Sequence, residues 1–232
     1  MSHNNFLLSL SYMFKNKLIQ TATILTLFAI LGAGLVTLSY SVTRDQIAHN
    51  EKMVLLRNLN ALVPAEDYDN DLFSDTTVVR DPLLLEHKET AMIYRARKEG
   101  QPVATIFDTL APDGYNGKIQ LLVGINVEGI ILGVRIVSHQ ETPGLGDLID
   151  IPRSNWVLGF NGHSLTNPTS DKWRVKRDGG IFDQFTGATI TPRAVVKAVH
   201  RALLLYDKHQ KELFITTNEN LKTTGKTTDK SP

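Results

Sequence analysis

The longest apolar stretch of the chain runs from Leu18 to Tyr40 and contains no charged residue. A helix of this length, at about 1.5 Å per residue, covers the roughly 30 Å hydrocarbon core of a bilayer. A cleaved signal peptide normally has a shorter apolar region that ends in an A-x-A-like site, and no such site is evident here. A buried helix of a soluble protein rarely continues so far without charge. The pattern therefore predicts one retained transmembrane helix over residues 18–40.

The charges that flank this segment indicate its orientation. Lys15 and Lys17 precede it, whereas Arg44 follows it with Asp45 close by. Because positive residues are enriched on the cytoplasmic side, residues 1–17 are expected in the cytoplasm. Everything after Tyr40 would then lie outside the cytoplasm, which is the periplasm if the source is a Gram-negative bacterium.

Residues 41–65 have the apolar spacing of a helix and are expected to form an amphipathic stalk that Pro64 ends. Its apolar face comprises Ile47, Ala48, Leu55, Leu59 and Leu62.

Period-two and β-branched patterns then predict a series of strands. These are Thr76–Val79, Ala91–Arg97, Pro102–Leu110, Lys118–Asn126 and Ile130–Ser138, with a further short strand considered at Trp173–Lys176. The clearest hairpin joins Lys118–Asn126 to Ile130–Ser138 through Val127-Glu128-Gly129. Both of its strands have apolar side chains on both faces, so both are expected to be central in the sheet.

One more helix is predicted from Thr191 to about Lys208, with an apolar stripe that includes Val195, Val199 and Leu203. Residues 216–232 are rich in Lys, Thr and Asp and are expected to be disordered. The fold class is therefore α+β: one N-terminal transmembrane helix, followed by an extracytoplasmic domain over residues 66–215 with a mainly antiparallel sheet and packed helices.

Composition narrows the chemistry. The net charge of +1 gives no reason to expect a nucleic-acid partner. The chain has no cysteine, which excludes thiolate-ligated iron–sulfur clusters, c-type haem attachment and disulfides.

Several common motifs are missing from the sequence. There is no nucleotide P-loop, no G-x-G-x-x-G after a strand and no G-x-S-x-G nucleophile elbow. His139, Glu141 and Asp147 are close enough in sequence to ligate a metal, but three such residues on a loop more often form a solvated turn. We expect no metal site and no catalytic residue.

Two glycine-containing segments are candidates for binding. Pro143-Gly144-Leu145-Gly146 reads equally well as a type II turn or as a surface on which backbone amides and Leu145 contact a planar ligand. In the stretch from Asp183 to Pro192, Thr191 and Pro192 read as the N-cap and first residue of a helix. The first turn of that helix can hold an anion such as phosphate.

This second segment carries a resemblance. Asp183-Gln184-Phe185-Thr186-Gly187-Ala188-Thr189 matches the D-x-x-[S/T]-G-A-T pattern of bacterial proteins with covalently bound FMN. The resemblance covers most of the chain, roughly from Lys15 to Tyr206. Besides the single span, it rests on four further segments: Ala111-Pro112-Asp113-Gly114-Tyr115, Gln120-Leu121-Leu122-Val123-Gly124, Glu141-Thr142-Pro143-Gly144-Leu145-Gly146-Asp147 and Lys176-Arg177-Asp178-Gly179-Gly180. The chain resembles the G subunit of the Rnf (Rsx) electron-transport complex. It also resembles, less closely, the C subunit of the sodium-pumping NADH:quinone reductase, which shares the FMN-binding domain.

The resemblance implies a set of FMN-binding residues. A dedicated flavin transferase would esterify the FMN phosphate to the threonine of G-A-T, which is Thr189, on the turn made by Gly187 and Ala188. Leu145, with Gly144, Gly146 and Thr142, would contact the flavin ring. Asp183 would fix the turn or be read by the transferase, Thr186 would hydrogen-bond the turn, and Thr191 would cap the helix. Lys176 would face the ring or the phosphate, unless it is an ordinary surface lysine.

The implied function is that of a membrane-anchored electron carrier in the bacterial inner membrane. Its partners would be the other membrane subunits of a complex that couples electron flow to ion movement. The alternatives are the C subunit of the sodium-pumping reductase, a membrane-anchored sensor or binding module without flavin, and a structural stalk without redox work.

Overall fold

The structure is a computed structural model that describes residues 17–81, 84 and 90–214. The predicted cytoplasmic segment and disordered tail therefore lie outside the described residues, apart from Lys17. The chain divides into two compact units, with the boundary between Val54 and Leu55.

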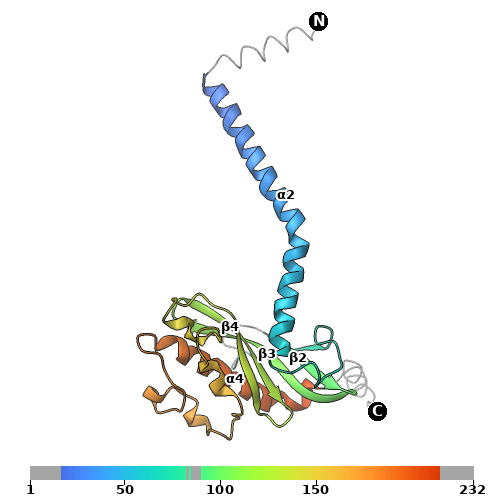
Figure 1. The fold of residues 1–232 in the computed structure, drawn as a ribbon, viewed down its shortest axis with the longest axis vertical. Helices are drawn as coiled ribbons and strands as arrows, with labels where there is room; N and C mark the ends of the chain where they lie inside the picture. The colour runs from blue at the N-terminus through green and yellow to red at the C-terminus, as the bar shows by residue number, and fades with distance from the viewer. Residues whose placement is uncertain (1–16, 82–83, 85–89, 215–232) are drawn as a thin grey trace, which may run out of the picture. The chain divides into compact units, whose positions relative to one another are not determined.

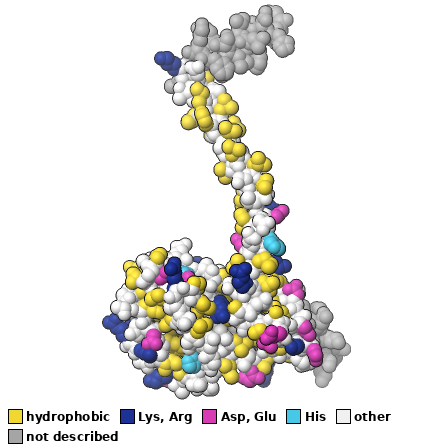
Figure 2. Space-filling view, viewed as in Figure 1, with side chains coloured by type: hydrophobic (Ala, Val, Ile, Leu, Met, Phe, Trp, Pro, Cys, Tyr) yellow, Lys and Arg dark blue, Asp and Glu magenta, His cyan; other side chains and the backbone are white. Residues whose placement is uncertain are grey.

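The first long element is one continuous helix, α2 (Lys17–Asn60), which includes the residues of the predicted span and most of those of the predicted stalk. It ends before Pro64. Among the described residues, α2 is the one helix long and apolar enough to cross a membrane, and Figure 2 shows the apolar side chains along it. Its threonine hydroxyls are satisfied within the helix. Thr23 and Thr26, for example, each donate to the carbonyl four residues earlier at 2.8 Å. The helix therefore presents few free polar groups to a hydrocarbon environment.

The second unit contains one five-stranded antiparallel sheet in the order β1-β2-β3-β4-β5 (Figure 1). The strands are β1 (Thr76–Val79), β2 (Ala91–Lys98), β3 (Gln101–Gly114), β4 (Gly117–Asn126) and β5 (Ile131–Ser138). The prediction that both hairpin strands are central is correct for β4 and wrong for β5, which is an edge strand. Its apolar character has another cause: the Ile131 amide donates to the carbonyl of His163, and the Gly162 amide donates to the carbonyl of Ile131, each at 2.8 Å, so a loop covers that part of the edge.

Apolar side chains alternate between the two faces of the sheet. One face, with Ile93, Phe107 and Val123, forms the larger core with helix α4 (Ile190–Leu213). The other face, with Tyr94 and Ile106, packs against the residues at the end of α2 and those that come after it. The sheet is thus buried on both sides, which accounts for its continuous apolar runs.

A pair of glycines lets the chain after α2 approach the sheet closely. Gly124 on β4 and Gly133 on β5 are paired in register. A Cβ on Gly133 would lie 2.9 Å from Leu62 Cδ2, and a Cβ on Gly124 would lie 3.2 Å from Leu62 Cβ. Leu62 therefore fills a notch that only glycine leaves open. Arg135 Nη2 also donates to the Ala61 carbonyl at 2.9 Å, which satisfies a backbone acceptor just beyond the helix end.

The segment between β5 and α4 has little regular structure. It contains the short 3₁₀ helices η1 (Gly146–Ile149), η2 (Trp156–Phe160), η3 (Ser170–Lys172) and η4 (Lys176–Asp178). The suggested strand at Trp173–Lys176 is wrong, because only a single bridge joins Val175 to Phe182 before η4 begins.

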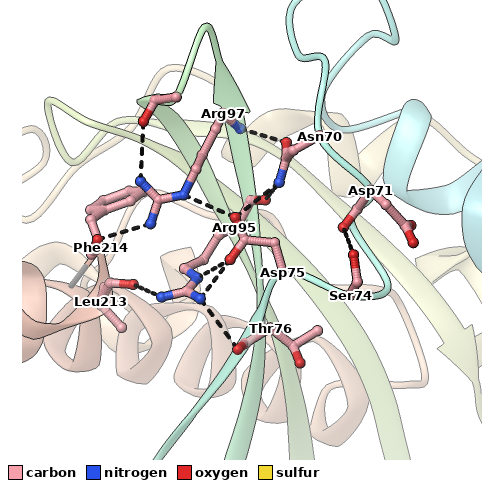
Figure 3. A network of polar contacts seen from close by, with 10 residues as sticks. Asn70, Asp71, Ser74, Asp75, Thr76, Arg95, Arg97, Leu213 and Phe214 are labelled. Atoms are coloured by element: carbon pink, nitrogen blue, oxygen red, sulfur yellow. Dashed lines mark hydrogen bonds and ion pairs between the residues drawn. The ribbon is translucent and has the colours of Figure 1, made fainter. Parts of the chain in front are cut away.

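The C-terminal end of α4 is held by two arginines from β2 (Figure 3). Arg95 Nη1 donates to the Leu213 carbonyl at 3.3 Å, and Arg97 Nη2 donates to the Phe214 carbonyl at 2.8 Å. Asp75 lies between the two guanidinium groups and accepts from Arg95 Nε at 2.6 Å and from Arg97 Nε at 2.9 Å. Positive charge at a helix C-terminus is favourable, and Asp75 fixes both cations there.

Removing the carboxylate of Asp75 should destabilise the second unit. Asp75→Asn leaves two neighbouring guanidinium groups, one of them buried, without their counter-ion, and we expect a loss of about 3 kcal/mol in the free energy of unfolding. Urea unfolding of the full chain in detergent measures this, because both tryptophans lie in the second unit and report on it. The matched control is Asp113→Asn, which removes an exposed ion pair with Lys197 and should cost less than about 1 kcal/mol. Equal losses in the two variants would contradict the assignment.

A second prediction concerns acid stability. Asp81 is 3% exposed and its carboxylate lies 2.6 Å from Lys208 Nζ. That hydrogen bond, helped by the Leu84 amide and His209 and opposed by burial, lowers the pKa of Asp81 from 3.8 to about 2. Because the folded-state pKa lies below the unfolded value, the ionised group stabilises the fold above about pH 4, and this contribution disappears as the pH falls towards 2. Asp81→Asn should be less stable than the wild type at pH 6, and the difference should shrink between pH 4 and pH 2 in urea titrations. A pH-independent difference would contradict the prediction.

Candidate functional site

Two glycine turns face each other next to the start of α4. In the first, the Leu145 amide donates to the Thr142 carbonyl at 3.1 Å, and Gly144 has φ 76°. In the second, the Ala188 amide donates to the Phe185 carbonyl at 3.2 Å, and Gly187 has φ 79°. A positive φ at the third turn position is typical of type II turns and favours glycine. A Cβ on Gly187 would lie 3.6 Å from Leu145 Cδ2, so the two turns are in close proximity.

A cavity of about 380 Å³ lies at these turns. This volume is in the range of small-molecule sites. Three of its lining side chains are apolar or aromatic and yet exposed: Tyr115 is 66% exposed, Ile190 45% and Leu145 41%. The full lining is Tyr115, Glu141, Thr142, Leu145, Gly146, Gly187, Ala188, Thr189, Ile190 and Thr191. The cavity therefore combines an apolar rim with hydroxyl groups and exposed backbone.

The structure brings most of the sequence-predicted residues together here. Thr142, Leu145, Gly146, Gly187, Ala188, Thr189 and Thr191 all line the cavity. Gly144 shapes the first turn without lining the cavity, and Thr186 is exposed on the second turn. Lys176 and Asp183 are outside the lining and pair with each other at 2.6 Å.

Three lining residues were not among those predicted from the sequence. Tyr115 follows the end of β3, Glu141 precedes the first glycine turn, and Ile190 begins α4. Tyr115 and Glu141 both belong to the segments that carry the resemblance, so that signal was available for them. Ile190 had no comparable signal beyond being an apolar residue next to Thr189.

Glu141 forms the buried polar centre of the site. It is 5% exposed, and one carboxylate oxygen accepts from the Asn116 amide at 3.0 Å. The other oxygen accepts a hydrogen bond from the hydroxyl of Thr191, which is fully buried. A Cβ on Gly146 would lie 2.7 Å from Glu141 Oε2 and 2.8 Å from Thr191 Oγ1. Glycine at position 146 is therefore required for this hydrogen bond.

The solvated turn expected for His139, Glu141 and Asp147 is wrong for the two acids, because both are buried. His139 and Asp147 each pair with another side chain of the domain: His139 Nε2 lies 2.9 Å from Asp150 Oδ2, and Asp147 Oδ2 lies 3.3 Å from Arg153 Nε. Within residues 17–81, 84 and 90–214, no group of three or more His, Cys, Asp or Glu residues is arranged to hold a metal ion.

Helix α4 begins at Ile190, so its N-cap is Thr189, whose side chain makes no capping hydrogen bond. The expected role of Thr191 as N-cap is wrong, because its hydroxyl is committed to Glu141. The hydroxyl of Thr189 is instead contacted by Arg193, whose Nη1 lies 3.4 Å from Thr189 Oγ1.

Aromatic packing supports the second glycine turn. Phe185 is buried against Trp156, with ring centroids 5.1 Å apart, and Trp156 in turn contacts Phe160 at 5.3 Å. Trp156 Nε1 also donates to the Asp183 carbonyl at 2.8 Å. The turn that carries Thr189 is thus supported by a rigid cluster, although it lies in a loop.

Comparison with known proteins agrees with this geometry. The model of the FMN-binding domain matches residues 114–204, a range that includes every residue lining the cavity. The model of the RnfG N-terminal region matches residues 13–62.

Curated relatives match most of the chain. A protein from Vibrio cholerae serotype O1 (strain M66-2), named as the G subunit of an ion-translocating oxidoreductase complex, is 52% identical over 84% of this chain and 92% of its own length. Proteins of the same name from Aliivibrio fischeri (strain ATCC 700601 / ES114) and Pseudoalteromonas atlantica (strain T6c / ATCC BAA-1087) are 48% and 45% identical, over 84% and 88% of this chain and 92% and 95% of their own lengths. Long, high-identity coverage together with the two matching domain models establishes that this chain belongs to the family of G subunits of ion-translocating oxidoreductase complexes.

Proposed function

We propose that this chain is the flavoprotein subunit of a membrane complex that couples electron transfer to ion translocation, and that it carries FMN esterified to Thr189. The observation that carries the proposal is the position of Thr189. Thr189 directly precedes α4 and lines the cavity, together with the other two residues of the G-A-T sequence.

The residues of the cavity fit FMN. Leu145, Ile190 and Tyr115 provide exposed apolar surface for a flat ring, and Gly146 and Gly187 leave backbone open to close approach. The first turn of α4 has unpaired backbone amides that favour an anion. FMN bound there would supply one-electron chemistry, which suits a relay between redox partners.

Attachment needs an enzyme. In the esterification the O–H bond of Thr189 and the bond between phosphorus and its leaving group break, and a new P–O bond forms to Oγ1. Among the described residues, no carboxylate or imidazole is hydrogen-bonded to the hydroxyl of Thr189, whose one contact of this kind is with the cation of Arg193. A weak nucleophile without a base is not activated. The proton acceptor is therefore supplied by a separate flavin transferase.

The membrane arrangement follows from α2 and the flanking charges. Residues 18–40 cross the inner membrane, residues 1–17 are cytoplasmic and the domain with the cavity is periplasmic. A covalent bond suits a cofactor outside the cytoplasm, where lost FMN is not readily replaced. The names of the relatives favour the G subunit of such a complex, with other membrane subunits as partners, over the C subunit of the sodium-pumping quinone reductase and over a flavin-free sensor.

The mass of the full chain tests covalent attachment. When it is co-expressed with a flavin transferase and purified in detergent, the wild type should gain a mass equal to FMN minus one water. Thr189→Ala should remove this gain. Thr166→Ala is the matched control, because Thr166 is an exposed threonine outside both the cavity lining and the D-x-x-[S/T]-G-A-T segment, and it should keep the gain. An unmodified wild-type mass would refute the proposal, and a flavin retained by Thr189→Ala would refute the choice of residue.

Gly146→Ala tests whether this cavity is the place that receives FMN. The new Cβ would press on Glu141 and Thr191, so we expect a loss of about 1–3 kcal/mol in stability and a lower flavin occupancy. Gly159→Ala is the control, since a Cβ there meets no atom within 4 Å. Flavin absorbance per chain and urea unfolding provide the two measurements, and wild-type occupancy in Gly146→Ala would count against the cavity.

A further inference from the structure

Arg193 lies on α4 one turn after Thr189 and has a fixed orientation. Its Nε donates to Asp178 Oδ2 at 2.6 Å, and its Nη2 donates to Asp178 Oδ1 at 2.8 Å. This two-point contact fixes the plane of the guanidinium group. The remaining nitrogen, Nη1, is directed at Thr189 and lies 3.4 Å from its hydroxyl oxygen.

Asp178 is itself held in place. It ends the one-turn helix η4 and is followed by Gly179, which has φ 85°. Gly180 then passes so close to the backbone of Arg174 that a Cβ would lie 1.8 Å from the Arg174 carbonyl oxygen. The loop can therefore adopt this path only with glycine, and the path brings Asp178 to Arg193.

Two further arginines act on Asp178 besides Arg193. The hydrogen bond from Arg193 is the largest cause of the lowered pKa of Asp178, and the charges of Arg177 and Arg174 lower it further. Lys176, the lysine suggested by the sequence, is paired with Asp183. Neither Lys176 nor Arg193 is part of the cavity lining, but Arg193 contacts the hydroxyl of Thr189, which is a lining residue. Arg193 is thus the cation positioned at the hydroxyl of Thr189.

We propose that Arg193 binds the phosphate of the FMN carried on Thr189. The inference rests on the function proposed above. A phosphate joined to both ribityl and threonine oxygens keeps one negative charge and two free oxygens, which an arginine nitrogen can contact while its other edge stays on Asp178. The N–H groups of Nη1, one of which donates to Thr189 Oγ1, and the second N–H group of Nη2 remain for this. Arg193 is a positioning residue: it orients the hydroxyl before attachment and holds the phosphate afterwards.

The first test uses unmodified full chain, expressed without a flavin transferase, and compares binding of FMN with binding of riboflavin, which lacks the phosphate. Quenching of flavin fluorescence gives both affinities in detergent. We expect the wild type to prefer FMN by about tenfold. Arg193→Gln should remove the preference and leave riboflavin binding unchanged, whereas Arg193→Lys should restore part of it. Lys197→Gln, one turn further along the same helix and outside the FMN cavity, is the control and should behave like the wild type.

These variants also separate phosphate binding from a merely structural clamp. If Arg193 only joined η4 to α4, Arg193→Gln and Asp178→Asn would weaken FMN and riboflavin binding by the same factor. A wild-type preference near one, or a preference that survives Arg193→Gln, would overturn the inference.

A second measurement decides the matter if free flavins bind too weakly. In the loaded chain, phosphorus NMR compares the folded protein with the same protein in urea. The wild-type resonance should shift on unfolding, and in Arg193→Gln this shift should be largely lost. A wild-type shift in loaded Arg193→Gln would overturn the inference while leaving covalent attachment intact. Conversely, an unmodified wild-type mass would refute covalent attachment to Thr189. The role of Arg193 would then still be tested by the preference of the unmodified chain for FMN over riboflavin.

Discussion

The geometry of the site depends on one buried hydrogen bond, from the Thr191 hydroxyl to the Glu141 carboxylate. The two residues are far apart in sequence, one after β5 and the other in the first turn of α4. A carboxylate removed from water must be compensated, and here the compensation comes from this hydroxyl and from the Asn116 amide. Because the acceptor precedes one glycine turn and the donor follows the other, satisfying the charge brings both turns to the same cavity.

Helix α4 is held at both ends, which gives Thr189 a fixed position. At its start, Thr191 is bound to Glu141 and Arg193 to Asp178. At its end, the last carbonyls are capped by Arg95 and Arg97 from β2. The middle of the helix packs on the sheet and excludes water. A residue at the beginning of such a helix is placed by the whole domain, whereas a residue in a free loop is placed only by its neighbours.

The sequence predicted those parts of the fold that depend on local patterns. The apolar helix, the strands β1 to β4 and helix α4 each have a periodicity that can be read within one segment. The edge position of β5 could not be read in this way, because its edge is covered by a loop around Gly162 with no regular structure. Capping by Thr191 was a sound local interpretation that a distant carboxylate overrides.

The candidate site shows the same division. Gly187, Ala188 and Thr189 were recognised because their motif is contiguous, and all three line the cavity. Arg193 was not singled out, since its importance arises from Asp178, which reaches it only through the path of the Gly179–Gly180 loop. Residues that meet only through the tertiary fold, such as Asp178 and Arg193, have no characteristic spacing in the sequence that would reveal the pair.

The notch formed by Gly124 and Gly133 has a consequence for how the length of the chain can vary. Leu62 fits that notch just after the end of α2. Each residue added to a helix rotates the downstream residues by about 100° around the helix axis. A single insertion or deletion between Leu55 and Asn60 would therefore turn Leu62 away from the glycines and place a neighbouring side chain over them. The number of residues in this last stretch of helix is consequently fixed by the sheet, even where the identity of exposed residues is free to change.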